Sequence, residues 1–327
     1  CIHMRVTFDL ESEGGIRRYG EFVERAADLV VSYGGSLSGE HGDGQSRGAL
    51  LPKMYGPELV RAFGEFKAAW DPDNRMNPHK VVNAYLPTEN LRLGADYKPM
   101  QPLTHFQFPD DGGSFAKAAL RCVGLGECRQ SEGGTMCPTY MATREEKHST
   151  RGRARMLWEL LQGEVVRGGW QDEDVKDTLD LCLSCKACKS DCPTNVDIAT
   201  YKAEFLSHYY EAKPRPLAAH VMGRIGEWAP LAAKLPGLFN RLSGFGKPFA
   251  GVAPQRKLPR LQKTFRSTFA SGGQQGERVV LFDDTFNNHF RPQTAAAAQK
   301  LLEAAGCAVE LPREHLCCGR PYYDYGM

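Results

Sequence analysis

The sequence predicts a multidomain α+β protein in which a mainly α-helical, cysteine-rich middle part separates two parts of mixed structure. A four-cysteine run, CLSCKACKSDCPTN at residues 182–195, stands between segments with helical periodicity. Near the C-terminus, the apolar run VVLFDD, a helical stretch over 293–305 and a second apolar run, CAVEL, follow one another. This order is typical of the start of an α/β domain, with Gly306 ending the helix.

The four-cysteine run has the spacing of an iron-sulfur site. Cys182, Cys185, Cys188 and Cys192 follow the pattern C-x2-C-x2-C-x3-C-P. In this pattern the first three thiolates bind one four-iron cluster and the fourth binds a neighbouring cluster. A structural zinc site is the alternative, although such sites usually use two separated CxxC pairs or mixtures of Cys and His.

A second cysteine segment upstream, RCVGLGECRQSEGGTMCPTY, repeats the outline of this run with changes. It contains Cys122, Cys128 and Cys137. If the fourth cysteines cross, Cys137 completes the cluster held by the first three cysteines of the run. Cys192 then joins Cys122 and Cys128.

The site formed by Cys122 and Cys128 is left open by the sequence, because Leu125 stands where the middle cysteine would be. It could hold a second four-iron cluster with a non-cysteine ligand such as Glu127 or Glu132, or a three-iron cluster. It could also hold no cluster, with Cys122 and Cys128 as buried thiols.

Composition and charge restrict the compartment and the partners. The 327 residues suggest two or three domains, and a net charge of +2 gives no case for binding nucleic acid. Iron-ligating thiolates require a reducing compartment. No apolar run approaches the roughly 20 residues that span a bilayer, and no signal peptide opens the chain. We therefore expect a cytoplasmic protein, or one at the inner face of the membrane.

The N-terminal part carries a glycine-rich loop with acid-base residues. Residues 4–10 alternate like a strand, and residues 16–33 have the periodicity of a helix that ends at a Gly-Gly pair. In the following loop, GEHGDG, adjacent Glu40 and His41 are able to coordinate a metal and move a proton. The alternative is a surface turn with scattered charges.

This loop, the predicted helix over 57–70 and the ending DPDNRMNPHK resemble the C-terminal part of FAD-linked oxidases that act on D-2-hydroxy acids. The resemblance implies an upstream flavin domain, a divalent metal such as zinc or manganese, and a catalytic base. By position, His3 and Glu40 would bind the metal and His41 would be the base.

The ending NPHK resembles a family ending, NPGK, that lies near the flavin. The resemblance implies that Asn77 and Lys80 contact FAD. His79 stands where the family has glycine, so a solvated chain end is the alternative.

Between the two cysteine segments, the stretch HSTRGRA begins a predicted helix over 150–166, capped by Ser149 or Thr150. The arginines that follow could donate hydrogen bonds to cluster sulfurs or raise the cluster potential by their charge. We expect at least two of the three to belong to a solvated helical face; they are Arg151, Arg153 and Arg155.

The order of these motifs resembles the large bacterial fused FAD and iron-sulfur D-2-hydroxyacid dehydrogenases, of which D-2-hydroxyglutarate dehydrogenase is the nearest type. The ending HLCCGRP resembles the CCG module of heterodisulfide reductase and glycolate oxidase iron-sulfur subunits. In that module an earlier cysteine precedes the CCG pair, and Thr285 stands near its place. A cluster on Cys317 and Cys318 is therefore not expected.

The predicted domain order follows from these motifs. A C-terminal piece of an FAD-linked oxidase cap is followed by a linker, an α-helical ferredoxin-type domain, a basic Pro/Gly-rich connector and the start of a CCG-type α/β domain. Their boundaries are 1–84, 85–113, 114–227, 228–276 and 277–327. The first residue is not Met and the CCG module occurs once, so we expect a fragment of a longer chain.

The resemblance implies an enzyme that oxidises a D-2-hydroxy acid, D-2-hydroxyglutarate in the first place, with FAD and 4Fe-4S clusters as cofactors. D-lactate and glycolate are alternative substrates, and an electron-transfer subunit without its own substrate site is the alternative function. Because clusters carry single electrons, a quinone or a soluble carrier is the expected acceptor. We further expect a homo-oligomer, with peripheral membrane contact through the connector as an open alternative.

Overall fold

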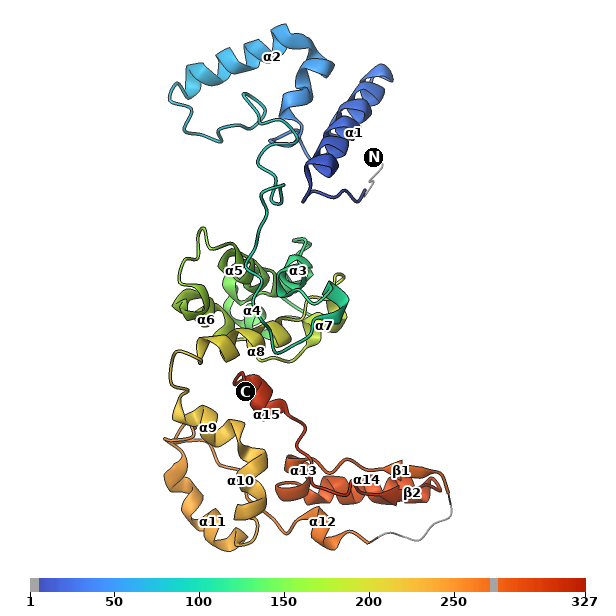
Figure 1. Cartoon of the computed structure of the whole chain (residues 1–327), viewed down its shortest axis with the longest axis vertical. Coiled ribbons are helices and arrows are strands. Elements are labelled where there is room, and N and C mark those ends of the chain that lie inside the picture. The colour runs from blue at the N-terminus through green and yellow to red at the C-terminus, as the bar shows by residue number, and fades with distance from the viewer. Residues whose placement is uncertain (1–5, 271–275) are drawn as a thin grey trace. The chain divides into compact units, whose positions relative to one another are not determined.

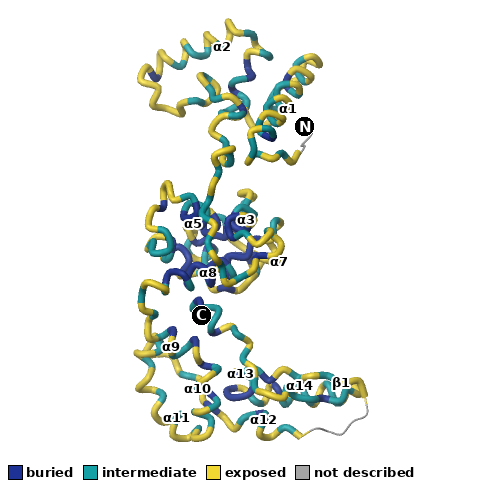
Figure 2. Tube along the Cα trace, in the orientation of Figure 1, coloured by how far each residue is buried: buried dark blue, intermediate teal, exposed yellow. Residues whose placement is uncertain are grey.

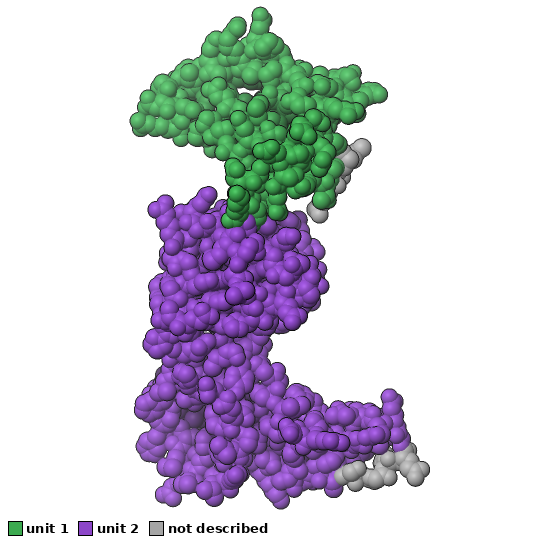
Figure 3. Space-filling model, in the orientation of Figure 1, with its two compact units in different colours: residues 1–98 green, residues 99–327 purple. Residues whose placement is uncertain are grey.

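The computed structural model describes residues 6–270 and 276–327, so the predicted metal ligand His3 lies outside the described residues. The chain divides into two compact units, residues 1–98 and residues 99–327 (Figure 3). The division falls inside the predicted linker, and the other domain boundaries stay predictions.

The first unit contains two long helices, α1 (Glu13–Ser32) and α2 (Leu51–Trp70). The hydroxyl of Ser12 accepts the amide of Gly15 and caps α1, and Lys53 of α2 pairs with Asp28 of α1 at 2.6 Å. The predicted strand over 4–10 is wrong in its described part, because residues 6–9 have no regular structure. Asp9 instead accepts the hydroxyl of Ser12 and helps to form the turn into α1.

Helix α2 is kinked where Gly56 adopts a left-handed conformation, with φ of 78°. Pro57 follows, and its missing N–H suits the first turn of the second segment. The predicted helix over 57–70 is therefore the longer part of α2.

The second unit begins with a bundle of short helices around the cysteines. They are α3 (Phe115–Leu120), α4 (Pro138–Thr143), α5 (Thr150–Gln162), α6 (Glu173–Asp180), α7 (Ala187–Asp191) and α8 (Ile198–Tyr209). Burial concentrates here, and most residues of α8 are buried (Figures 1 and 2). Helix α5 ends earlier than predicted because Gly163 is left-handed, with φ of 72°.

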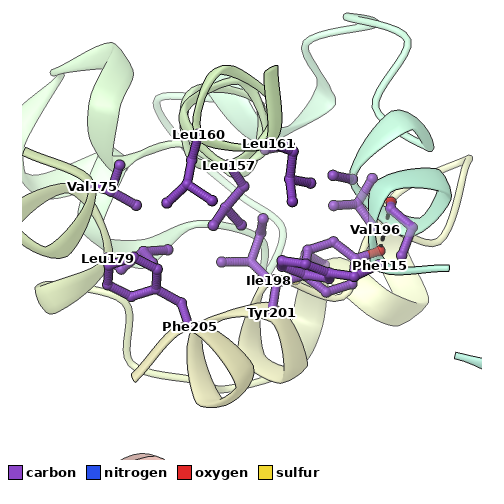
Figure 4. Packing of buried hydrophobic residues seen from close by; sticks show 14 of the residues in the cluster. Phe115, Leu157, Leu160, Leu161, Val175, Leu179, Val196, Ile198, Tyr201 and Phe205 are labelled. Carbon is purple, nitrogen blue, oxygen red and sulfur yellow. Dashed lines mark hydrogen bonds between the residues drawn. The ribbon is translucent and has the colours of Figure 1, made fainter. Parts of the chain in front are cut away.

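The hydrophobic core of this bundle lies between α5, α6 and α8 (Figure 4). Leu157 and Leu160 of α5 face Phe205 of α8, and all three are at most 1% exposed. Removing one such leucine side chain typically costs about 2–5 kcal/mol. The core therefore fixes the distances between helices that precede or follow the cysteine segments in the chain.

A buried carboxylate fastens the start of the unit to α8. Glu204 is fully buried and accepts the backbone amides of His105 and Phe106 at 2.9–3.1 Å. It also binds the ring of His208 at 2.8 Å. These bonds satisfy a charge that would otherwise be costly to bury.

The rest of the unit contains short helices and a two-stranded sheet. The helices are α9 (Leu217–Gly223), α10 (Ile225–Ala232), α11 (Pro236–Leu242), α12 (Phe265–Thr268), α13 (Thr285–His289), α14 (Pro292–Ala304) and α15 (Arg320–Asp324). Strand β1 (Arg278–Val280) pairs in parallel with β2 (Ala308–Glu310), as the predicted α/β start requires. None of the described helices combines the length and apolar character that crossing a bilayer needs.

Helix α15 contacts both the bundle and helix α10, which follows the bundle in the chain. Tyr323 exchanges a hydrogen bond with Thr200 of α8 at 2.8 Å, and Arg320 donates to the carbonyl of Leu183 at 2.7 Å. The hydroxyl of Tyr322 donates to Glu227 of α10.

Candidate functional site

Four predicted cluster ligands from two distant segments line one small cavity. Cys137 precedes α4, Cys182 and Cys185 lie in the loop before α7, and Cys188 lies on α7. Left-handed backbone at Ser184 and Lys186 curls this loop so that its cysteines line the same cavity. This is the grouping that the crossing rule predicts for the first cluster.

The other three predicted ligands line a second cavity. Cys192 lies there with Cys122 and Cys128, together with Leu125 and Glu127. Glu132, the second carboxylate considered as a ligand, is exposed and does not line this cavity. Of the two carboxylates considered as ligands, Glu127 is therefore the one that lines this cavity.

The N-terminus of α5 points at both groups of sulfurs. The amide of Thr150 donates to Cys137 Sγ at 2.9 Å, and the amide of Arg151 donates to Cys128 Sγ at 3.2 Å. Ser149 caps the helix by accepting the amide of Gly152 at 2.9 Å. Amide hydrogen bonds and the positive helix end stabilise anionic sulfur.

The thiol environments differ in a way that fits cluster ligands. The side chain of Cys137, and then the amide of Arg151, lower the pKa of Cys128. Contact with Cys128, followed by burial, raises the pKa of Cys137. Burial raises the pKa of Cys188 to about 11. Metal binding removes the proton of a thiol outright, so bound iron would hold Cys137 and Cys188 as thiolates despite their raised pKa values.

The three arginines after Ser149 have different surroundings. Arg155 pairs with Glu159 and lies over the ring of Trp158, and Arg151 pairs with Glu146 at 2.7 Å. Arg153 is 2% exposed and lines the cavity of Cys137, donating to a carbonyl and a hydroxyl at 3.0 Å. Only this arginine of the three is a buried cation beside a cavity.

A second buried cation, Lys202 of α8, was not predicted from the sequence. Its ammonium donates to the carbonyls of Asp180 and Cys182 at 3.1 and 2.9 Å. Burial lowers its pKa, and the nearby Cys182 opposes this effect. The signal in the sequence was a lysine between the apolar residues Tyr201 and Ala203 of α8.

No three His, Cys, Asp or Glu side chains in the described ranges, 6–270 and 276–327, lie close enough to share a single metal ion. The cysteines instead surround two cavities, with donors aimed at their sulfurs, an arrangement that fits multi-iron clusters.

The two oxidase-like motifs of the first unit contact each other. The carbonyl of Gly44 accepts the amide of Val81 at 2.8 Å, and the ammonium of Lys80 donates to Gln45. The loop with Glu40 and His41 therefore adjoins the ending that contains Asn77, which is exposed.

The acid-base pair of this loop lies at the surface. His41 Nε2 and Glu40 Oε1 are 2.9 Å apart, and both side chains are more than half exposed. His79 has φ of 60°, a conformation that glycine favours, and stacks on Tyr85. The backbone at His79 therefore has a conformation that a glycine adopts more easily.

The CCG segment brings Cys317 near Thr285, the residue that stands where the module's earlier cysteine is expected. A Cβ atom built on Gly226 would lie 3.0 Å from Cys317 Sγ and 3.5 Å from Thr285 Oγ1. His315 shares a hydrogen bond with Thr285 at 3.3 Å. Within the described residues, neither ring nitrogen of the buried His289 has a hydrogen-bond partner.

Comparison with known families identifies two parts of the chain. Residues 1–81 match the FAD linked oxidases, C-terminal domain, and residues 118–196 match the 4Fe-4S dicluster domain. The chain therefore joins an FAD-linked oxidase C-terminal domain to a 4Fe-4S dicluster domain, and the predicted fold class is confirmed.

Its similarity to whole proteins extends over most of its length. It is 29% identical to a D-2-hydroxyglutarate dehydrogenase of Pseudomonas putida, over 100% of this chain and 37% of the relative. It is 27% identical to the enzyme of that name from Pantoea ananatis, over 93% and 35%. The glycolate oxidase iron-sulfur subunit of Escherichia coli is 26% identical over 64% and 48%. The chain thus spans about a third of the dehydrogenases' length, and no solved structure matches it.

Proposed function

We propose that this chain serves an FAD- and iron-sulfur-dependent D-2-hydroxyacid dehydrogenase that oxidises D-2-hydroxyglutarate to 2-oxoglutarate. The observation that carries the proposal is the sorting of cysteines from two distant segments into two cavities, in a chain that also carries an oxidase C-terminal domain. The names of the relatives favour this substrate over D-lactate or glycolate.

In this proposal the chain's residues position two kinds of cofactor. Cys137, Cys182, Cys185 and Cys188 hold one 4Fe-4S cluster, and the cavity of Cys192 holds the second. When bound, FAD would supply a hydride acceptor for the substrate, and the clusters would supply single-electron carriers.

His41 is the proposed base. It takes the proton of the substrate hydroxyl, and its bond to Glu40 at 2.9 Å fixes the orientation of the imidazole ring. A divalent ion held by Glu40 and His3 would lower the hydroxyl pKa, and it remains part of the proposal.

The deciding experiment replaces His41 with Ala in the holoenzyme and measures reduction of a soluble dye by D-2-hydroxyglutarate. We expect a loss of at least 100-fold, because general-base catalysis typically contributes 10²–10⁴-fold. Arg61→Ala, an exposed change on α2, is the control and should leave the rate unchanged. Normal turnover by the His41 variant would instead favour an electron-transfer subunit without its own substrate site.

Iron and acid-labile sulfide analysis of anaerobically purified protein tests the two cavities. About seven or eight irons per chain support two clusters, whereas about four leave the cavity of Cys122 and Cys128 without one. Zinc in place of iron would refute the electron-transfer part of the proposal.

A further inference from the structure

An apolar cavity of about 430 Å³ lies among the helices that follow the cluster bundle. It is lined by side chains of α9, α10, α11 and neighbouring segments, including Val221, Ile225, Trp228, Phe239 and Phe290. Its volume is that of a small-molecule site. The only titratable side chain of its lining is His220.

Two aromatic rings in the wall of this cavity are held in place. The rings of Trp228 and Phe239 stack at 5.4 Å with 27° between their planes. Trp228 Nε1 donates to the carbonyl of Val221 at 2.7 Å, so the polar atom of the indole is satisfied. The cavity therefore offers flat apolar surfaces, which suit a flat lipophilic molecule.

The elements around the cavity expose large apolar side chains between cations. Six large apolar side chains between residues 231 and 249 are at least half exposed. They are Leu231, Leu235, Leu238, Leu242, Phe245 and Phe249. Lys234, Arg241 and Lys247 stand among them in the sequence. Apolar side chains interleaved with cations favour contact with an anionic membrane surface, where lipophilic molecules are dissolved.

Helix α15 joins this region to the first cluster cavity. Arg320 donates to the carbonyl of Leu183, which lines the cavity of Cys182 and Cys185. Two residues later, Tyr322 donates to Glu227 on α10, the helix that carries Trp228. One short helix therefore contacts both a cluster loop and a wall of the apolar cavity.

We propose that the apolar cavity binds the ring of a lipid-soluble quinone, which is the electron acceptor. This inference rests on the proposed function. The hydroxy acid loses two electrons and two protons as its C–OH group becomes a carbonyl. The quinone takes up two electrons and two protons, forming two O–H bonds, and His220 lies in the lining to deliver a proton.

The binding test uses the fluorescence of Trp228 and decyl-ubiquinone as the probe. We expect saturable quenching in the unchanged protein, loss of most of this signal in Trp228→Phe, and at least tenfold weaker binding in Ala250→Phe, which fills the cavity. Ala304→Phe, an exposed change on α14, is the matched control. If Ala250→Phe fails to fold, Ser243→Leu fills the same cavity from another side.

Any of three results would overturn the inference. They are non-saturable quenching, unchanged binding in Ala250→Phe, and equal competition by decanol, which has the tail without the ring.

An activity test separates the inference from the proposed function. With D-2-hydroxyglutarate, Ala250→Phe should lose at least tenfold in quinone reduction while reduction of ferricyanide stays unchanged. If the unchanged holoenzyme reduces neither acceptor, the proposed function fails, and the fluorescence titration still decides whether the cavity binds quinone.

Discussion

At the scale of single residues, two buried cations stand beside the first cluster cavity. Arg153 and Lys202 come from α5 and α8 and are 2% and 8% exposed. A four-iron cluster with four thiolates is anionic and becomes more so on reduction, so nearby cations favour the reduced form. These two cations should therefore raise the reduction potential of a cluster bound in this cavity.

Replacing Lys202 with Met should lower the reduction potential of this cluster. A unit charge roughly 10 Å away in a medium of effective dielectric about 20 contributes about 1.7 kcal/mol, which corresponds to tens of millivolts for one electron. Potentiometric titration followed by electron paramagnetic resonance measures the shift. Lys176→Met, which removes a cation paired with Asp180 on α6, is the control, and equal potentials in both variants would refute this role.

Sequence reasoning grouped the cysteines and named Arg153 as one of three candidate cations, but it did not find Lys202. The C-x2-C-x2-C-x3-C spacing, together with the crossing of the fourth cysteines, predicted which cysteines line each cavity. Their role as cluster ligands stays a prediction. Lys202 reaches Cys182 only because the core packs α8 against α6. Such a contact depends on tertiary packing, which a single spacing does not encode.

At the scale of elements, α5 combines a cap with a sulfur-binding end. Ser149 is fully buried and fixes the first turn, whose amides bind Cys137 and Cys128. The predicted cap is confirmed, but hydrogen bonds to the sulfurs were considered only for the arginine side chains, whereas the backbone amides of this turn make them. Loss of the Ser149 cap should therefore both destabilise the protein and weaken the binding of iron.

Ser149→Ala should cost about 1 kcal/mol of stability and speed the loss of iron to a chelator. Ser114→Ala removes the cap of α3, whose hydroxyl accepts the amide of Lys117, and should cost a similar amount without affecting iron loss. Thermal unfolding and chelator kinetics, measured on both variants, test the difference. Equal rates of iron loss would show that α5 acts only as a scaffold.

Within the predicted connector, residues 228–276, the structure forms the end of α10 and the helices α11 and α12, although no helical period was recognised there. Pro230 and Pro236 interrupt the stretch, so no helical period is long enough to be recognised. The apolar cavity that α9, α10 and α11 line could not be predicted, because its wall includes Phe290 from a later segment.

At the scale of the whole molecule, the second unit has two separate hydrophobic cores. One fills the cluster bundle, and the other surrounds Ile225, Leu261 and Phe290. Beside the second core lies His289, with His315 at 5.1 Å between ring centroids. The two regions should therefore respond differently to acid.

Acid should destabilise the region of α13 and α14 before the cluster bundle. Burial, and then the charge of His315, lower the pKa of His289 from 6.5 to about 4, against an opposing effect of Asp283. Between these values only the unfolded chain binds the proton, so stability falls as the pH drops, by about 1.4 kcal/mol per unit at most. Hydrogen exchange of α13 at pH 7 and pH 5 measures the loss, with α8 as internal reference.

His289→Phe is the matched variant for this prediction. It keeps an aromatic ring of similar size and should remove most of the pH dependence from α13. An unchanged dependence would assign it to other groups, such as the Arg266–Asp283 pair.

The crossing of cysteines between the two cavities determines when this protein can be assembled in the cell. Each cavity draws sulfurs from both sides of α5, and the cavity of Cys122 is complete only once Cys192 has been added. A nascent chain that ends before Cys182 contains three of the seven predicted cluster ligands but no complete set for either cavity. Iron and sulfide delivery to this domain must therefore follow its translation, which makes the newly made, metal-free domain the species that the cell has to protect from oxidation.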